Sequence, residues 1–118
     1  MQLSKDFTSD EFTCNHCGKL PSGQPPKALV DILQKTRDHF GVPVVINSGY
    51  RCPTHNANVG GAQNSRHVVG DAADIAVKNV HAHAVYDYVA TLLAGTGGLG
   101  KYDTFTHVDT RPGGPARW

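Results

Sequence analysis

The stretch Ser65–Asp74 constrains this chain more than any other, because it combines two metal-binding side chains with small residues. It reads S-R-H-V-V-G-D-A-A-D and places His67 and Asp74 seven residues apart. Imidazole nitrogen and carboxylate oxygen are both zinc ligands, and a site with three protein ligands keeps one coordination position open. The third candidate ligand is His107, in F-T-H-V-D near the C-terminus. The sequence therefore predicts a metal site built from distant parts of the chain.

Two of the three candidate ligands fall on expected strands. The run from Asp74 to Val77 is short and apolar, which predicts a buried strand from which Asp74 projects at a fixed angle. Residues 102–110 alternate well enough to predict a final strand, with Phe105, His107 and Asp109 on one face. Strands would hold the ligands more firmly than loops.

The remaining segments predict an α+β fold, with two helices packed on a small antiparallel sheet. The clearest helix begins at Pro26 and stops at Gly41, with apolar side chains spaced three to four residues apart. Residues 42–46 predict a strand at a sheet edge, because Pro43 cannot donate a ladder hydrogen bond. A second helix is expected over residues 80–94, loops over 3–25 and 52–64, and a hinge-like turn over 95–100.

Size and charge limit the possible functions. A chain of 118 residues fits a single domain, 1–118, and its formal charge of +1 gives no indication of nucleic-acid binding. No apolar run is long enough to cross a membrane, and the start M-Q-L-S-K-D lacks the apolar core of a signal peptide. We therefore expect a monomer that is made in the cytoplasm and has no nucleic-acid or membrane partner.

A second cluster of metal-binding residues is independent of the first. Cys14 and Cys17 form C-x-x-C, and Cys52 and His55 form C-x-x-H. Three thiolates and one imidazole would make a closed, structural zinc site that holds the irregular segment 1–25. His16 could replace His55, and the cysteines could instead form one disulfide or remain separate thiols. The odd cysteine count and the expected cytoplasmic origin disfavour a disulfide framework.

Four motifs together carry a family resemblance that covers roughly residues 7–118. They are S-G-Y-R-C-P-x-H-N, S-x-H-x-x-G-x-A-x-D, G-L-G-K-Y and H-V-D. These motifs resemble the zinc D-Ala-D-Ala carboxypeptidase family, which includes phage L-alanyl-D-glutamate endolysins and is similar in fold to the hedgehog N-terminal domain. The chain looks most like the short, single-domain peptidoglycan peptidases of bacteriophages and bacterial envelopes.

The resemblance assigns roles to individual residues. It makes His67, Asp74 and His107 the three zinc ligands and has Arg51 bind a substrate carboxylate or orient its carbonyl. Ser65 matches a serine that contacts substrate. The implied reaction is hydrolysis of amide bonds in peptidoglycan stem peptides, by a carboxypeptidase or endopeptidase that uses a zinc-bound water.

The chain departs from the resembled family at the general base. Several branches place Glu or Asp three residues before the last ligand, where this chain has Thr104. Asp109 shares a strand face with His107 and is the favoured base, although it could instead orient a ligand. Asp103 is the other candidate carboxylate.

Two classes of function follow from these features. The first is a cell-wall zinc peptidase that acts on peptidoglycan peptides after release from the cytoplasm, as in phage lysis. The alternative is a non-catalytic, hedgehog-like binding module that keeps zinc for structure. Arg51 and Ser65 favour the enzyme, because a purely structural metal has no need of them, whereas Thr104 favours the binding module.

Overall fold

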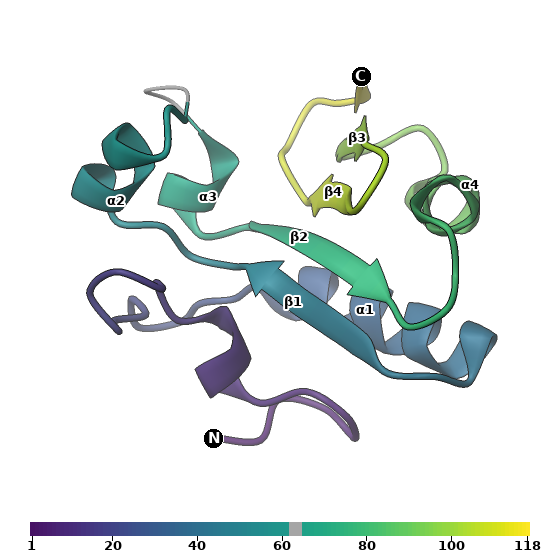
Figure 1. Cartoon of the computed structure of the whole chain (residues 1–118), viewed down its shortest axis with the longest axis horizontal. Coiled ribbons are helices and arrows are strands. Elements are labelled where there is room, and N and C mark those ends of the chain that lie inside the picture. Colours follow the sequence, from purple (N-terminus) through teal and green to yellow (C-terminus); the bar gives the residue numbers. More distant parts are fainter. Residues whose placement is uncertain (62–64) are drawn as a thin grey trace.

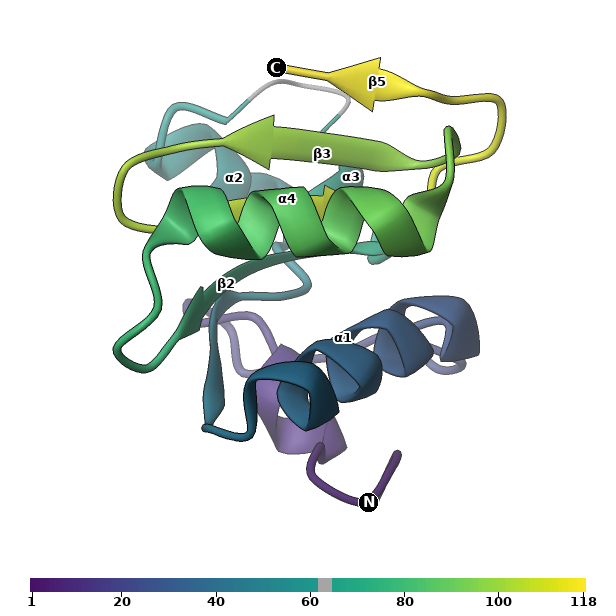
Figure 2. The same cartoon turned by 90° about the vertical axis from the view of Figure 1, so that its right-hand side faces the viewer.

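The sheet has five strands in the order β1-β2-β4-β3-β5. Figure 1 labels β1 to β4, and Figure 2 labels β5. The structure is a computed structural model and describes residues 1–61 and 65–118. The strands are β1 (Val44–Ser48), β2 (Ala72–Val77), β3 (Gly98–Lys101), β4 (Thr106–Asp109) and β5 (Ala116–Arg117). β1 is an edge strand, as Pro43 predicted, and it starts at Val44, two residues later than expected.

Strand register brings two of the candidate ligands together. β2 and β4 are antiparallel, and Asp74 is directly opposite His107. β4 also pairs with β3, and only the short strand β5 runs parallel to its neighbour. The predicted antiparallel sheet is therefore present, with a parallel strand added at its far edge.

Two long helices cover one face of this sheet. They are α1 (Lys27–Phe40) and α4 (Ala82–Leu93), which lie close to each other in Figure 2 and contact each other. Side chains alternate along a strand, so Ala73, Ile75 and Val77 join the helices in the core while Asp74 faces the other way. The core also includes Leu29, Leu33, Val85, Val89, Leu99 and Val108. The opposite face of the sheet is therefore left for a functional site.

The ends of α1 lie where the sequence predicted them. Pro26 is the N-cap, and Gly41 ends the helix in the left-handed conformation with its N–H bonded to the carbonyl of Arg37. α4 is capped by the side chain of His81, which accepts the N–H of His83 at 3.1 Å. His81 therefore has a local structural role. No described helix combines the length and the apolar character that a membrane crossing requires.

Three segments differ from the prediction, the first being the final strand: it was expected over residues 102–110, but β4 begins only at Thr106. Residues 52–64 were expected to be a loop, but α2 (Pro53–Asn58) forms there with Cys52 as its N-cap, while residues 62–64 lie outside the described part. Residues 95–100 were expected to form a hinge-like turn, yet β3 is an inner strand of the sheet. The glycines of β3 led to the wrong prediction, because glycine is uncommon in strands.

The N-terminal segment is irregular, as expected, but it is firmly packed. Its one helical turn is η1 (Ser9–Phe12), where Thr8 and Glu11 form a capping box. Phe7 and Phe12 are each 1% exposed and belong to the core. The segment runs beneath β1 in Figure 1, next to the loop that leads to the candidate site.

Candidate metal centre

The three ligands predicted from the sequence meet at one point. His67 Nε2 lies 3.2 Å from Asp74 Oδ1, and His107 Nδ1 lies 3.0 Å from the same oxygen. One ligand atom from each residue lies within 4.8 Å of the other two. Bonds of about 2.0 to 2.1 Å to a tetrahedral zinc ion imply donor-to-donor distances of roughly 3.3 Å. The donor set and its spacing therefore fit a zinc ion.

Local structure positions each ligand. His67 belongs to α3 (Arg66–Val69), which starts at the N-cap Ser65 and ends at Gly70 in the left-handed conformation. Asp74 and His107 are fixed by the opposed register of β2 and β4. One helix and two strands thus present three side chains at the sheet face opposite α1 and α4.

The outer nitrogen of each histidine has its own acceptor. His67 Nδ1 donates to the carbonyl of Gly49 at 2.8 Å, and His107 Nε2 donates to Asp109 Oδ2 at 2.8 Å. These bonds set the tautomer, so that the lone pairs of His67 Nε2 and His107 Nδ1 point to the metal position. Support of this kind is typical of a metal site.

Asp109 lies behind His107 and not in the pocket. It is fully buried, and Arg111 donates to it from Nε at 2.8 Å and from Nη2 at 2.7 Å. This geometry argues against the expected role of general base, because the carboxylate is already saturated with donors. It favours the alternative that Asp109 orients a ligand. Asp103 offers no better base, since its side chain is 94% exposed and pairs with His83.

The electrostatics of the site favour a bound cation. Burial raises the pKa of Asp74, but hydrogen bonds from His107 and His67 outweigh it and lower the pKa to about 2. Burial also opposes ionisation of Asp109, yet the Arg111 guanidinium holds the pKa of this carboxyl well below its usual range. Burial lowers the pKa of His107, but the two carboxylates raise it overall. Two ionised carboxylates therefore flank His107 at neutral pH.

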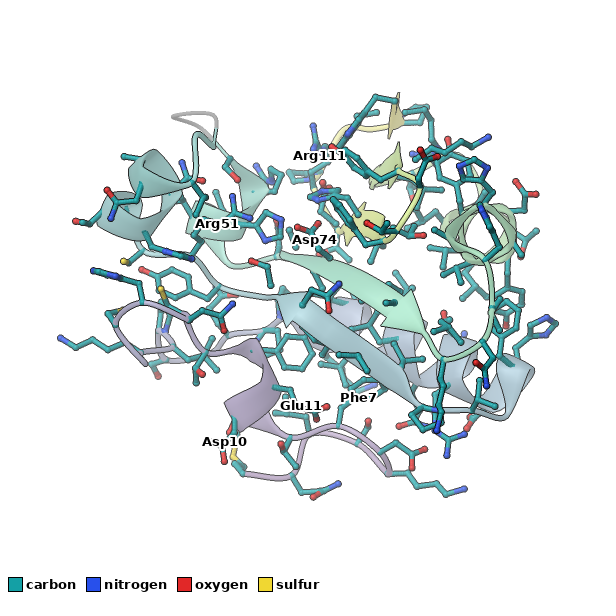
Figure 3. The ribbon with its side chains drawn as sticks, in the orientation of Figure 1. Phe7, Asp10, Glu11, Arg51, Asp74 and Arg111 are labelled. Carbon is teal, nitrogen blue, oxygen red and sulfur yellow. The ribbon has the colours of Figure 1, made fainter. Side chains whose placement is uncertain are left out.

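The ligands lie in an open pocket of about 500 Å³. Three arginines line it, and Figure 3 labels two of them, Arg51 to the left of Asp74 and Arg111 above it. Arg111 is held by Asp109, and the third, Arg66, is held through Nε and Nη2 by Asp71. Two of the three guanidinium groups are thus neutralised by the protein's own carboxylates.

Arg51 is the exception. Its Nη2 lies 3.8 Å from Asp74 Oδ2, and it donates to Asn56 Oδ1 at 3.0 Å and Ser48 Oγ at 3.3 Å. Its Nε is buried and has no hydrogen-bond partner among the described residues. A guanidinium whose Nη2 lies beside the metal position, and which has no bidentate carboxylate partner among the described residues, suits an anionic or carbonyl group of a ligand.

Ser65 also lies on the pocket wall, as its predicted substrate contact requires. Its Oγ accepts the N–H of His67 at 3.2 Å, so capping of α3 is a second reason for a serine here. The hydroxyl hydrogen remains able to donate to a ligand.

An aromatic wall completes the pocket and was missed from the sequence. Tyr102 and Phe105 stack with ring centroids 4.3 Å apart, and Trp118 lies 5.0 Å from the ring of His107. Trp118 Nε1 donates to the hydroxyl of Tyr102 at 2.8 Å. Arg66 and Arg111 were missed as well. Arg66 is next to a ligand in sequence, which was an available signal, whereas Trp118 is brought in by β5 alone.

The second predicted cluster is assembled in part. The sulfur atoms of Cys14, Cys17 and Cys52 lie within 4.8 Å of one another, and all three cysteines are free. His55 stacks on His16 with ring centroids 5.7 Å apart, so both candidate imidazoles lie near each other. Cys14 is buried, while Cys17 is at the surface.

Comparison with known proteins places this geometry in a family. The sequence model of a family described as peptidase M15 matches residues 5–109 of this chain. This chain belongs to the peptidase M15 family. Over 81 residues it is also 41% identical to a zinc D-Ala-D-Ala carboxypeptidase from Streptomyces albus G, an alignment that covers 64% of this chain and 31% of that relative. The chain thus spans about a third of the curated relative's length.

Membership of the M15 family confirms the resemblance predicted from the sequence motifs. The matched span includes the three candidate ligands, Arg51 and all three cysteines, but it stops before Arg111 and Trp118. In this M15 chain, the residues that hold Asp109 and close the aromatic wall therefore lie beyond the matched span.

Proposed function

We propose that this M15 chain is a zinc-dependent peptidase that hydrolyses amide bonds in the stem peptides of bacterial peptidoglycan. The observation that carries the proposal is Arg51, whose Nη2 lies 3.8 Å from the ligand Asp74 and whose guanidinium is not paired bidentately with a carboxylate among the described residues. The name of the Streptomyces relative, a zinc D-Ala-D-Ala carboxypeptidase, supports this reaction class.

A zinc ion held by these ligands would supply a Lewis acid and a water acidic enough to ionise near neutral pH. The protein's own residues supply the rest. Arg51 holds the substrate carboxylate or the developing negative charge through its guanidinium fork. Ser65 donates a hydrogen bond from the pocket wall, and the rings of Tyr102 and Phe105 pack against the apolar parts of the peptide.

Arg51 also suggests which peptides are preferred. It is the only pocket arginine among the described residues that is not in a bidentate pair with a carboxylate of the protein. A peptide with a free carboxylate close to the scissile bond would satisfy it, whereas the corresponding amide would lose a charge-assisted hydrogen bond. Within the proposed function we therefore expect stem peptides with a free carboxylate near the cleaved bond.

One observation favours the alternative of a non-catalytic binding module. Among the described residues that line the pocket, Asp74 is the only carboxylate, and it is occupied as a ligand. Thr104, at the position where related branches carry an acid, is exposed and cannot accept a proton from water. The module would bind a wall peptide through Arg51 without cleaving it.

The deciding experiment is digestion of purified peptidoglycan and synthetic stem peptides by zinc-loaded protein, with products identified by mass spectrometry. We expect one defined bond to be cleaved, no cleavage by His67→Ala, and a loss on the order of a hundredfold in kcat/KM for Arg51→Ala. His39→Ala, which lies away from the pocket, is the matched control. Binding of the peptides without cleavage would establish the module instead.

The endolysin-like role is a further part of the proposal, together with action on the wall after release. Lysis of intact bacteria from outside by the purified chain would support it. Cleavage of isolated peptides without lysis of any wall type would restrict the chain to trimming soluble or already opened wall material.

A further inference from the structure

The three cysteines lie on the far side of the loop that carries Arg51. Cys14 and Cys17 come from the N-terminal segment, whereas Cys52 directly follows Arg51, so the cluster joins segments 38 residues apart. The peptidase reaction proposed above has no use for these thiols. Free thiols gathered from separate segments are typical of a metal site.

Backbone N–H groups around the cluster point at sulfur. Cys52 N donates to Cys14 Sγ at 3.4 Å, and His55 N donates to Cys52 Sγ at 3.4 Å. Gly18, directly after Cys17, has a φ of +70° and donates its N–H to the carbonyl of Cys14 at 2.8 Å, which closes the turn between the two cysteines. Hydrogen bonds to sulfur favour the thiolate, the form that binds metal.

The fourth ligand must come from a nearby side chain. His55 is half-buried and lies in the first turn of α2, three residues after the N-cap Cys52. His16 is exposed and stacks against its outer face, with the two ring planes 4° apart. Burial and the short C-x-x-H turn favour His55. The group of ligand atoms within 4.8 Å of one another holds the three sulfur atoms, so the His55 side chain must turn toward them to bind.

We propose that Cys14, Cys17, Cys52 and His55 bind one structural zinc ion, separate from the ion at the pocket. Three thiolates and one imidazole fill all four tetrahedral positions, so this site has no opening for a substrate or a reacting water. A disulfide fits the cluster less well than zinc, because three thiols cannot all pair as disulfides.

The site acts on the pocket through the loop 49–52. Tyr50 N donates to Phe12 O at 2.8 Å, and Arg51 N donates to His67 O at 2.9 Å. The carbonyl of Gly49 accepts the proton of His67 Nδ1, as described above. An ion that ties Cys52 to the N-terminal segment therefore holds both Arg51 and the acceptor of a pocket ligand. It is a positioning device and takes no part in the chemistry.

The test is zinc content per chain, measured by mass spectrometry of the metal in full-length protein. Wild type is expected to hold two zinc ions, His67→Ala one, and Cys17→Ser one. The matched control is Lys19→Ser, an exposed change in the same loop, which should keep two. Zinc retained by His67→Ala is counted without any peptidase assay, so failure of the proposed function leaves this result intact. No zinc in His67→Ala would overturn the proposal.

Cobalt identifies the ligands. Cobalt-loaded His67→Ala should show the near-ultraviolet thiolate-to-cobalt band, and adding Cys17→Ser should abolish it. His55→Gln should release zinc at lower chelator concentration than His16→Gln; the reverse order would overturn the ligand set.

If Cys17→Ser does not fold, wild-type protein still decides. Blocking its thiols with a mercurial should release one zinc per chain, and release of none would contradict the site.

Discussion

His107 lies between two carboxylates, and each one contacts a different ring nitrogen. Asp74 is on the side of the metal position, at 3.0 Å from Nδ1, and Asp109 is behind, at 2.8 Å from Nε2. Replacement of Asp74 should therefore affect metal binding directly, and replacement of Asp109 should affect it through the imidazole of His107. The two roles can be separated experimentally.

We expect Asp109→Asn to weaken zinc binding about 10- to 100-fold, because the amide holds His107 less well and leaves Arg111 unpaired. At saturating zinc most of the peptidase activity should return. Zinc affinity by competition with a chelating dye, followed by activity at high zinc, measures both effects. Asp103→Asn, at the exposed carboxylate, is the control and should change neither. Unaltered zinc affinity with lost activity would restore Asp109 as the general base.

Zinc affinity should depend on pH through His107. The pKa of His107 is raised above 6.5, and zinc needs the neutral ring, so a proton must leave before the metal binds. Affinity should therefore be constant at high pH and fall about tenfold per pH unit below the raised pKa. Zinc affinity measured over about three pH units, from roughly pH 5.5 to about 8.5, would show the pH at which the affinity begins to fall. Asp109→Asn removes one cause of the raised pKa, so in this variant the fall should begin at lower pH.

At the scale of elements, β3 shows why glycines can occupy an inner strand. A side chain at Gly98 would collide with the Asp109 carboxylate and with Arg111 Nε, and one at Gly100 would meet the Trp118 indole at 2.5 Å. Both glycines are on the face of the site, whereas Leu99 between them is in the core. The strand lacks side chains on the face of the site because Asp109, Arg111 and Trp118 cover it there.

Gly98→Ala should displace the Asp109–Arg111 pair and cost about 1 to 3 kcal/mol of unfolding free energy. It should also weaken zinc binding, because Asp109 holds His107. Urea unfolding in chelator and zinc titration measure the two losses. Gly41→Ala is the control: no heavy atom lies within 4 Å of the added carbon, and its left-handed backbone alone should cost about 1 kcal/mol. Unchanged zinc affinity in Gly98→Ala would contradict this account.

The elements that could be predicted from sequence are those with a periodic apolar pattern of their own. α1 and α4 have such a pattern, and Gly41 marks the end of the first. β3 could not be predicted, because the reason for its glycines lies in side chains that reach it from Asp109, Arg111 and Trp118. The ligands were predictable because metal chemistry limits the residue types, while the aromatic wall depends on tertiary packing that leaves no local trace.

At the scale of the whole molecule, the pocket joins side chains from distant parts of the chain. α3, β2 and β4 each supply a ligand, and β5 adds Trp118 over them. A bound ion stabilises the folded chain by an amount that grows with the logarithm of the ratio of free zinc to the dissociation constant, because the unfolded chain does not assemble the three ligands.

Removal of the pocket metal should therefore lower global stability. With free zinc at 100 times the dissociation constant, the folded state gains about 2.7 kcal/mol over the metal-free protein. Urea unfolding of Cys17→Ser with zinc and with chelator isolates this contribution from the proposed structural site. The difference should vanish when His67→Ala is added; a difference that persists would place the stabilising ion elsewhere.

The direct opposition of Asp74 and His107 across β2 and β4 makes strand pairing and zinc binding a single event. A slip of one residue would turn His107 toward the helices and leave Asp74 facing no imidazole. Zinc in solution therefore selects for the correct strand register, because it binds and stabilises only chains whose sheet is correctly aligned. Zinc supplied during refolding should raise the yield of the native sheet before any substrate is present.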